Sequence, residues 1–244
     1  MTLPTMLTIL ATASFLLAER VFPGRSLPHA SGWYLRAISI NFLQLYITVC
    51  TARLWLGVFT GGPLFNLSDW QSPIGEGFVG WFLGTFIFYW WHRLRHAPGF
   101  WRVFHQIHHS PARIEILTSF YKHPIEILAN STITAILLFP ILGCSLVAIF
   151  WYNFFAATGE YFYHANLRTP RWLRYFIQTP ELHSVHHQYD VHSFNFGDIP
   201  LWDRLFGTYR DRISFTDRCG FPEGAEQKLI DMLVFRDAYK EGAA

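Results

Sequence analysis

The sequence predicts an all-α integral membrane protein, with four to five membrane-associated helices and a cytoplasmic helical cap that holds a histidine-rich dimetal site. Three observations lead to this expectation. Hydrophobic residues make up 51% of the 244 residues and charged residues only 15%, against about 25% in a typical soluble domain. Several apolar stretches are long enough to enter a bilayer. Most of the twelve histidines are spaced like metal ligands on helices.

The apolar stretches define the expected membrane segments, which are residues 3–18, 37–59, 78–91 and 125–157. No basic residue precedes the first stretch and no cleavage site of small residues is evident, so we expect a retained span rather than a signal peptide. The last stretch is interrupted near Pro140 and Gly143. It is long enough for two short spans or for a re-entrant hairpin.

Basic residues predict the orientation of these segments. The loop after the first stretch carries Arg20, Arg25 and Arg36, whereas residues 57–77 contain no Lys or Arg. The histidine-bearing segments and the tail also carry many Lys and Arg residues, so the positive-inside rule, which counts these residues, places them on the cytoplasmic face. The expected location is therefore a multi-pass position in a bacterial inner membrane or the endoplasmic reticulum, with the site facing the cytoplasm.

Nine of the twelve histidines form three clusters and one outlier, which are His92 and His96; His105, His108 and His109; His183, His186 and His187; and His164. Residues three and four apart share one face of an α-helix, so each cluster can direct two or three imidazoles at one point. Together they offer about four or five ligands to each of two metal ions. Imidazole binds iron, zinc and copper, so the spacing alone does not name the metal.

The order of the segments HRLRH, HQIHHS, YKHPIEIL, HAN, PELHSVHHQYD and NFGDIPLWDRLFGTYRD resembles the fatty acid hydroxylase superfamily, also called the sterol desaturase family. The resemblance runs over about residues 78–211. It implies a catalytic domain over 78–211, preceded by N-terminal spans in 1–77 and followed by a cytoplasmic tail in 212–244.

The resemblance also implies an activity. Members of this family are integral membrane enzymes with a histidine-rich di-iron centre, and they use O2 and two supplied electrons to hydroxylate or desaturate lipids. The expected substrate is a fatty acyl, sterol or other isoprenoid lipid, and the expected cofactors are two Fe ions, with Zn as a possible occupant and O2 as co-substrate. The eight clustered histidines match the family's ligand boxes, and His164 matches the histidine before the last box.

The tenth ligand is open, because some members have a histidine where this chain has Glu160. Glu160 is the candidate catalytic residue, and it would either bind a metal directly or orient His164. His123 is the other candidate ligand, although the following proline disfavours helix at that position, and it would instead cap the next helix. Asn166 and Asn195 are candidates for holding the ligands in place.

The expected partners follow from what the chain lacks. Cys50, Cys144 and Cys219 form no cluster, and the glycine pattern at 75–80 does not follow a strand, so neither supplies a redox cofactor site. Electrons would then come from a separate protein, a b-type cytochrome, ferredoxin or reductase. The lipid substrate would enter from the membrane. A net charge of +2 gives no reason to expect nucleic acid.

A competing hypothesis is that the chain is a membrane metal protein without redox chemistry. A zinc-dependent hydrolase needs about three protein ligands and a general base, fewer than this chain offers. A metal transporter should place ionisable residues in mid-membrane, whereas these histidines lie beyond the apolar stretches. An inactive homologue also remains open, because of Glu160.

Overall fold

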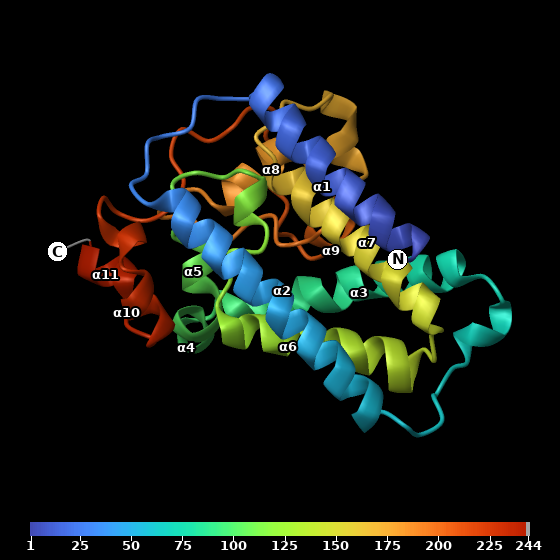
Figure 1. The fold of residues 1–244 in the computed structure, drawn as a ribbon. Helices are drawn as coiled ribbons and strands as arrows, with labels where there is room; N and C mark the ends of the chain where they lie inside the picture. Colours follow the sequence, from blue (N-terminus) through green and yellow to red (C-terminus); the bar gives the residue numbers. More distant parts are fainter. Residues whose placement is uncertain (243–244) are drawn as a thin grey trace.

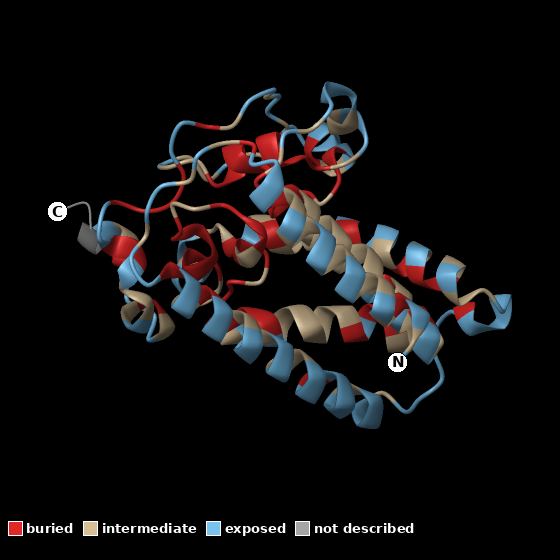
Figure 2. Ribbon diagram, turned by 45° about the horizontal axis from the view of Figure 1, so that its top comes forward, coloured by how far each residue is buried: buried red, intermediate tan, exposed pale blue. Residues whose placement is uncertain are grey.

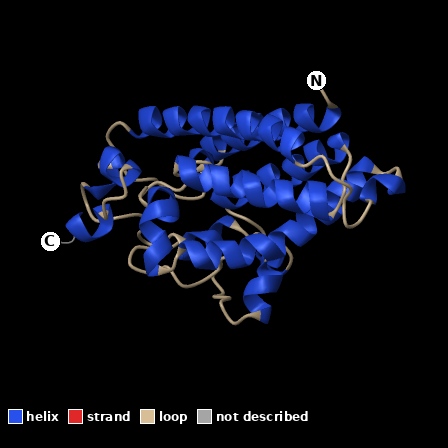
Figure 3. Ribbon diagram, turned by 90° about the horizontal axis from the view of Figure 1, so that it is seen from below, coloured by secondary structure: helices blue, strands red, loops and turns tan. Residues whose placement is uncertain are grey.

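The computed structural model describes residues 1–242, and within them the regular structure is helical (Figure 3). The all-α class expected from the sequence is confirmed. The described residues contain five long helices, which are α1 (Leu3–Val21), α2 (Trp33–Val58), α3 (Pro73–Arg95), α6 (Pro124–Ile136) and α7 (Leu146–His164). A π-helical turn (Leu137–Ile141) extends α6. Apart from one isolated bridge between Gln188 and Cys219, these residues pair in no strand.

The long helices pack in pairs, with α3 and α1 against α7 and α2 against α6 (Figure 1). Within residues 1–242, two helices are long and apolar enough to cross a membrane, Trp33–Val58 and Pro124–Ile141. Only 17% of the apolar window of α2 is buried, and Phe42 and Tyr46 are 69% and 68% exposed. An apolar surface of this size faces lipid rather than water, and the chain is a membrane protein.

Two glycines bring α3 close to its neighbours. A Cβ atom at Gly77 would lie 2.6 Å from the Cβ of Trp151, and one at Gly80 would lie 2.7 Å from a methyl group of Leu138. The glycine pattern at 75–80 therefore serves helix packing. Glu76, which precedes Gly77, is buried and accepts the N–H of Ser145 at 2.8 Å, which ties the start of α7 to α3.

The interruption expected at Pro140 and Gly143 separates α6 from α7. Gly143 adopts a left-handed conformation, with φ of 61°, which glycine reaches without steric cost. Ser145 then caps the start of α7, and its hydroxyl accepts the N–H of Ala148 at 3.3 Å.

Short helices and loops form a cap at one end of the long helices (Figure 1). They are α4 (Pro98–Phe100), a π-helical turn (Trp101–His105), α5 (Gln106–His109), η3 (Ile116–Thr118), η5 (Arg171–Tyr175), α8 (Pro180–His186), α9 (Pro200–Leu205), η6 (Ala225–Gln227), α10 (Leu229–Leu233) and α11 (Ala238–Gly242). Figure 2 shows the buried residues concentrated where this cap meets the long helices. Met232 and Phe221 pack there with Ile107 of α5 and Trp33 of α2. The C-terminal segment thus covers the element that carries the second histidine cluster.

Candidate metal centre

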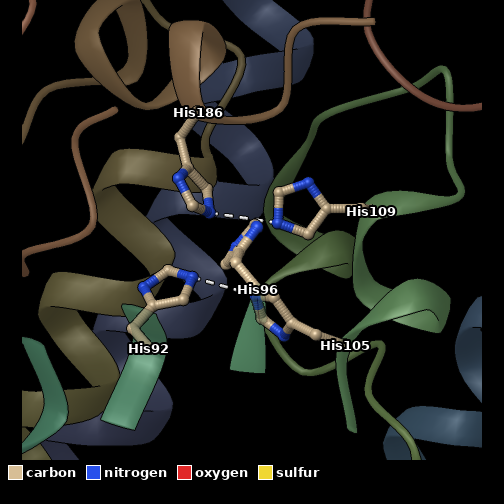
Figure 4. Close-up of side chains that lie close together, drawn as sticks. All are labelled: His92, His96, His105, His109 and His186. Carbon is tan, nitrogen blue, oxygen red and sulfur yellow. Dashed lines mark hydrogen bonds between the residues drawn. The ribbon is translucent and has the colours of Figure 1, made fainter. Parts of the chain in front are cut away.

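Nine histidine side chains converge from α3, the segment around α5, α7 and α8 into two groups. The five-histidine group consists of His92, His96, His105, His109 and His186, and the four-histidine group consists of His108, His164, His183 and His187. Within each group the candidate ligand nitrogens lie within 4.8 Å of one another. Figure 4 shows the imidazoles of the five-histidine group pointing toward a common centre. All nine side chains are buried except that of His96, which is partly exposed.

The second and third clusters each serve both groups. His105 and His109, one helical turn apart, belong to the five-histidine group, whereas His108 between them turns to the four-histidine group. The third cluster divides in the opposite sense, because His186 alone joins the five-histidine group. The two groups therefore adjoin, and the rings of His109 and His187 stack with centroids 4.3 Å apart.

The spacing of the nitrogens fits ligands that share an ion. In the five-histidine group, the Nε2 atoms of His92 and His105 are 2.8 Å apart, and those of His109 and His186 are 3.0 Å apart. In the four-histidine group, His164 Nε2 lies 3.3 Å from that of His108 and 3.1 Å from that of His183. Two imidazole nitrogens bound at about 2.1 Å to one metal at a right angle would be separated by about 3 Å.

Backbone carbonyls determine which nitrogen of three imidazoles carries the proton. His92 Nδ1 lies 2.7 Å from the carbonyl oxygen of Phe196, and His186 Nδ1 lies 2.9 Å from that of Phe194. His164 Nδ1 lies 2.8 Å from the carbonyl oxygen of Glu160. Because a carbonyl only accepts, each Nδ1 donates its hydrogen, which leaves the lone pair on Nε2. Those lone pairs face the centres of the groups, as metal binding requires.

A carboxylate orients a fourth imidazole. Glu126, in the first turn of α6, is fully buried and pairs with Arg95 at the end of α3. His105 Nδ1 lies 3.3 Å from a carboxylate oxygen of the same Glu126. The guanidinium compensates the buried negative charge, and the carboxylate accepts the imidazole hydrogen. Arg95 and Glu126 thus fix His105 with its Nε2 toward the five-histidine group.

Burial keeps the cap histidines neutral. It lowers the pKa of His105, His108, His109, His183 and His187 well below the usual range, and that of His186 to about 3. Neutral imidazole is the form that binds a metal. Among the described residues, both ring nitrogens of His96 are buried without a hydrogen-bond partner. Unpaired buried nitrogens are costly, and a bound cation would offset that cost.

Two sequence-predicted residues lie outside both groups. Glu160 accepts a hydrogen bond from Lys122 Nζ at 2.9 Å, and its other oxygen lies 3.6 Å from His164 Nδ1. The carboxylate is thus on the outer side of His164. His123 Nδ1 accepts the N–H of Ile125 at 3.1 Å, so this imidazole caps α6 and does not reach either group.

The two asparagines hold loops rather than imidazoles. Asn195 adopts a left-handed conformation and donates to the carbonyls of Leu182 and Arg210, both at 3.0 Å. It therefore fixes the loop whose neighbouring carbonyls, at Phe194 and Phe196, accept from His186 and His92. Asn166 pairs with the backbone of Arg25 and ties the end of α7 to the loop after α1.

The role of Asp203 in α9 was not evident from the sequence. This carboxylate is fully buried and accepts the N–H groups of Phe196 and Gly197, both at 2.8 Å, and the hydroxyl of Thr208 at 2.7 Å. It supports the loop that holds His92. Its position in the WDRLFGTY segment was the available signal, but the pattern does not show which atoms the carboxylate contacts.

Comparisons with known proteins agree with this geometry. A family model described as fatty acid hydroxylase matches residues 77–208, more than half of the chain. Fatty acid hydroxylase domain-containing protein 2 of Macaca fascicularis is 31% identical over 50% of this chain and 34% of its own length. Alkylglycerol monooxygenase of Xenopus tropicalis is 28% identical over 57% of this chain and 31% of its own length. Ornithine lipid hydroxylase OlsE of Rhizobium tropici is 32% identical over 57% of this chain and 44% of its own length.

The matches thus span less than half the length of each of these relatives. No solved structure matches the chain. The extent of the family match, together with the histidine groups inside it, shows that this chain belongs to the fatty acid hydroxylase family.

Proposed function

We propose that this chain is a membrane-bound, O2-dependent di-iron oxidoreductase that hydroxylates or desaturates a C–H bond of a lipid. The observation that carries the proposal is the pair of adjoining histidine groups within the family-matched region. A pair of redox-active iron ions would supply the activation of O2, which amino-acid side chains do not perform. Relatives named as a hydroxylase and a monooxygenase support oxygen insertion as the first outcome to test.

The donor set favours iron over a zinc hydrolase. A catalytic zinc site has about three protein ligands and an open position, whereas these groups offer four and five imidazoles. Neutral imidazoles also leave more positive charge on a metal pair than the glutamates of soluble di-iron bundles do. That difference would shift the redox potential of the pair.

The surroundings of the five-histidine group suit an apolar substrate. The ring of Phe196 packs on His92, His96 and His186, with centroids 5.2 to 5.6 Å apart. An aromatic ring therefore covers this side of the five-histidine group. A fatty acyl, sterol or other isoprenoid chain arriving from the bilayer would meet a surface of its own polarity.

The proposal includes a separate source of electrons and a location. The three cysteines are unpaired and dispersed, Cys50 on α2, Cys144 before α7 and Cys219 in the cap. Electrons would come from a b-type cytochrome, ferredoxin or reductase that docks on the Lys- and Arg-bearing surface of the cap. The chain would cross the membrane several times, with the cap on the cytoplasmic face, because its basic residues gather there.

The test measures metal content and O2 consumption together. The protein is purified under reducing conditions, loaded with iron, and mixed with an artificial electron donor and a lipid extract. We expect one iron per histidine group and O2 uptake that depends on lipid, with a product that has gained one oxygen atom or lost two hydrogens. Tightly bound zinc, with no O2 uptake after iron loading, would overturn the proposal.

A further inference from the structure

Six of the large apolar side chains that the cap exposes lie in or just after two of its short helices. They are Trp172, Tyr175 and Phe176 in and just after η5, and Leu201, Leu205 and Phe206 in and just after α9, and together they form the cap patch. Phe176 is 68% exposed and Leu205 is 63% exposed. A contiguous apolar surface of this kind on a folded protein marks a contact with a membrane or another molecule.

The two parts of the cap patch are joined by arginines. The guanidinium of Arg204 donates to the carbonyl of Arg174 at 3.3 Å and lies over the rings of Tyr175 and Tyr209, at 5.3 and 4.5 Å from their centroids. Arg174 lies over Tyr175 from its own side, at 5.2 Å. These contacts make η5 and α9 one surface rather than two independent loops.

The cap patch continues the apolar surface of α3. The ring of Trp202 in α9 packs against Phe86 and Phe82 of α3, with centroids 5.0 and 5.9 Å apart. Phe206 packs against Trp90 at 4.8 Å. Phe82, Phe86 and Trp90 are themselves 38 to 43% exposed. One apolar surface therefore runs from a long helix of a membrane protein onto its cap.

The rim of the cap patch is basic. Arg168 shortly before η5, Arg171 at its start and Arg204 in α9 are exposed, while the nearby Asp211 pairs with Arg174 at 3.0 Å. Tryptophan and tyrosine are typical of the boundary between headgroups and acyl chains, and arginine extends its cation to the headgroups. Basic side chains also attract the anionic lipids of a bilayer surface. This composition, together with the continuity of the cap patch with the exposed apolar face of α3, fits a lipid surface.

We propose that η5 and α9 lie in the headgroup–acyl boundary of the leaflet on the side of the cap, as a membrane contact that does not span the bilayer. Because α9 carries Asp203, this contact would hold the loop over the five-histidine group at a fixed depth against the lipid. The inference depends on the membrane character of the chain and is independent of the proposed reaction.

The test places a nitroxide label on the cap patch of the full chain in vesicles of phosphatidylcholine and phosphatidylglycerol. Phe176→Cys and Leu205→Cys are made separately, with Cys50→Ser and Cys144→Ala to remove the accessible native thiols. Ile230→Cys is the matched control, because Ile230 is an equally apolar residue, 72% exposed, on α10. Electron paramagnetic resonance then compares accessibility to O2, which partitions into lipid, with accessibility to a polar nickel chelate.

We expect O2 accessibility to exceed nickel accessibility at positions 176 and 205, and the reverse at position 230. Nickel accessibility as high at 176 and 205 as at 230 would overturn the proposal by showing a water-facing surface. Low accessibility to both reagents would overturn it too, since a protein surface, such as a second copy of the chain, would then cover the cap patch. The measurement needs no turnover, so its failure is distinct from failure of the proposed function.

Discussion

Asp203 and His92 bind opposite sides of one peptide group, the one between Phe196 and Gly197. The N–H of Gly197 donates to Asp203 at 2.8 Å, and the carbonyl of Phe196 accepts from His92 Nδ1 at 2.7 Å. The orientation of His92 therefore depends on a carboxylate that never touches it. Burial raises the pKa of Asp203, and its three hydrogen-bond donors favour the charged form.

Replacing Asp203 with Asn should weaken metal binding at the five-histidine group. The amide has one acceptor oxygen where the carboxylate has two. Its NH2 group would therefore face another donor, either the N–H of Gly197 or the N–H of Phe196. We expect a loss of about 10- to 100-fold in metal affinity or activity, as for other groups that orient ligands. Titration of the metal-free protein measures the affinity directly.

The control for this variant is Asp217→Asn, at an exposed carboxylate in the same cap. It should bind metal as the unmodified protein does. Equal affinities in the Asp203→Asn variant and the unmodified protein would contradict the positioning role of Asp203.

His108 and His109 are neighbours in sequence but belong to different groups. We expect His108→Ala to lower the metal affinity of the four-histidine group and His109→Ala to lower that of the five-histidine group. Each variant should keep one iron tightly bound, and Mössbauer spectra should show a different remaining iron in the two cases. His29→Ala, at an exposed histidine in a loop, is the control and should keep both. Identical spectra from the two variants would contradict the division into groups.

The sequence reveals the local spacing of the residues at this site but not their long-range packing. The ligand candidates could be found because a separation of three or four residues is a local property of helices. The division of His105, His108 and His109 between two groups could not, because it depends on how α5 faces α7 and α8. The pairing of Arg95 with Glu126 was hidden for the same reason, since it joins the ends of two helices.

The membrane segments show the same contrast. Apolar composition predicted the long helices, and both the π-helical turn that contains Pro140 and the left-handed Gly143 after it reflect backbone chemistry that a sequence displays. How many of these helices cross the bilayer stays a prediction, as does the division at residues 77 and 211. The sequence offered two roles for His123, as a metal ligand or as a helix cap. In the folded chain its ring contacts the first turn of α6 and the carbonyl of Leu233, away from both histidine groups.

Glu160→Gln distinguishes a ligand from an orienting group. The carboxylate binds Lys122 and lies on the Nδ1 side of His164, so we expect the variant to keep the metal of the four-histidine group while its affinity falls. Metal content and affinity, measured on the same preparation, give the answer. Glu223→Gln, at an exposed carboxylate, is the control. Complete loss of that metal in Glu160→Gln alone would show that Glu160 is itself a ligand.

Acidification should unfold the metal-free protein. Burial lowers the pKa of His186 to about 3 and those of His108, His109 and His183 well below the usual range, whereas in the unfolded chain a histidine titrates near about 6.5. As the pH falls below about 6.5, the unfolded state therefore binds more protons than the folded state, and the free energy of unfolding decreases.

Each such histidine lowers the free energy of unfolding by about 1.4 kcal/mol per pH unit below that point. We expect the stability of the metal-free protein in detergent, measured by chemical denaturation, to be flat above about pH 7 and to fall steeply toward about pH 5. His186→Asn should make the fall shallower, because it removes one buried group that the unfolded state protonates. Iron bound to the folded state should extend the stable range to lower pH. A metal-free protein whose stability does not change between these pH values would show that the imidazoles are not held neutral by burial.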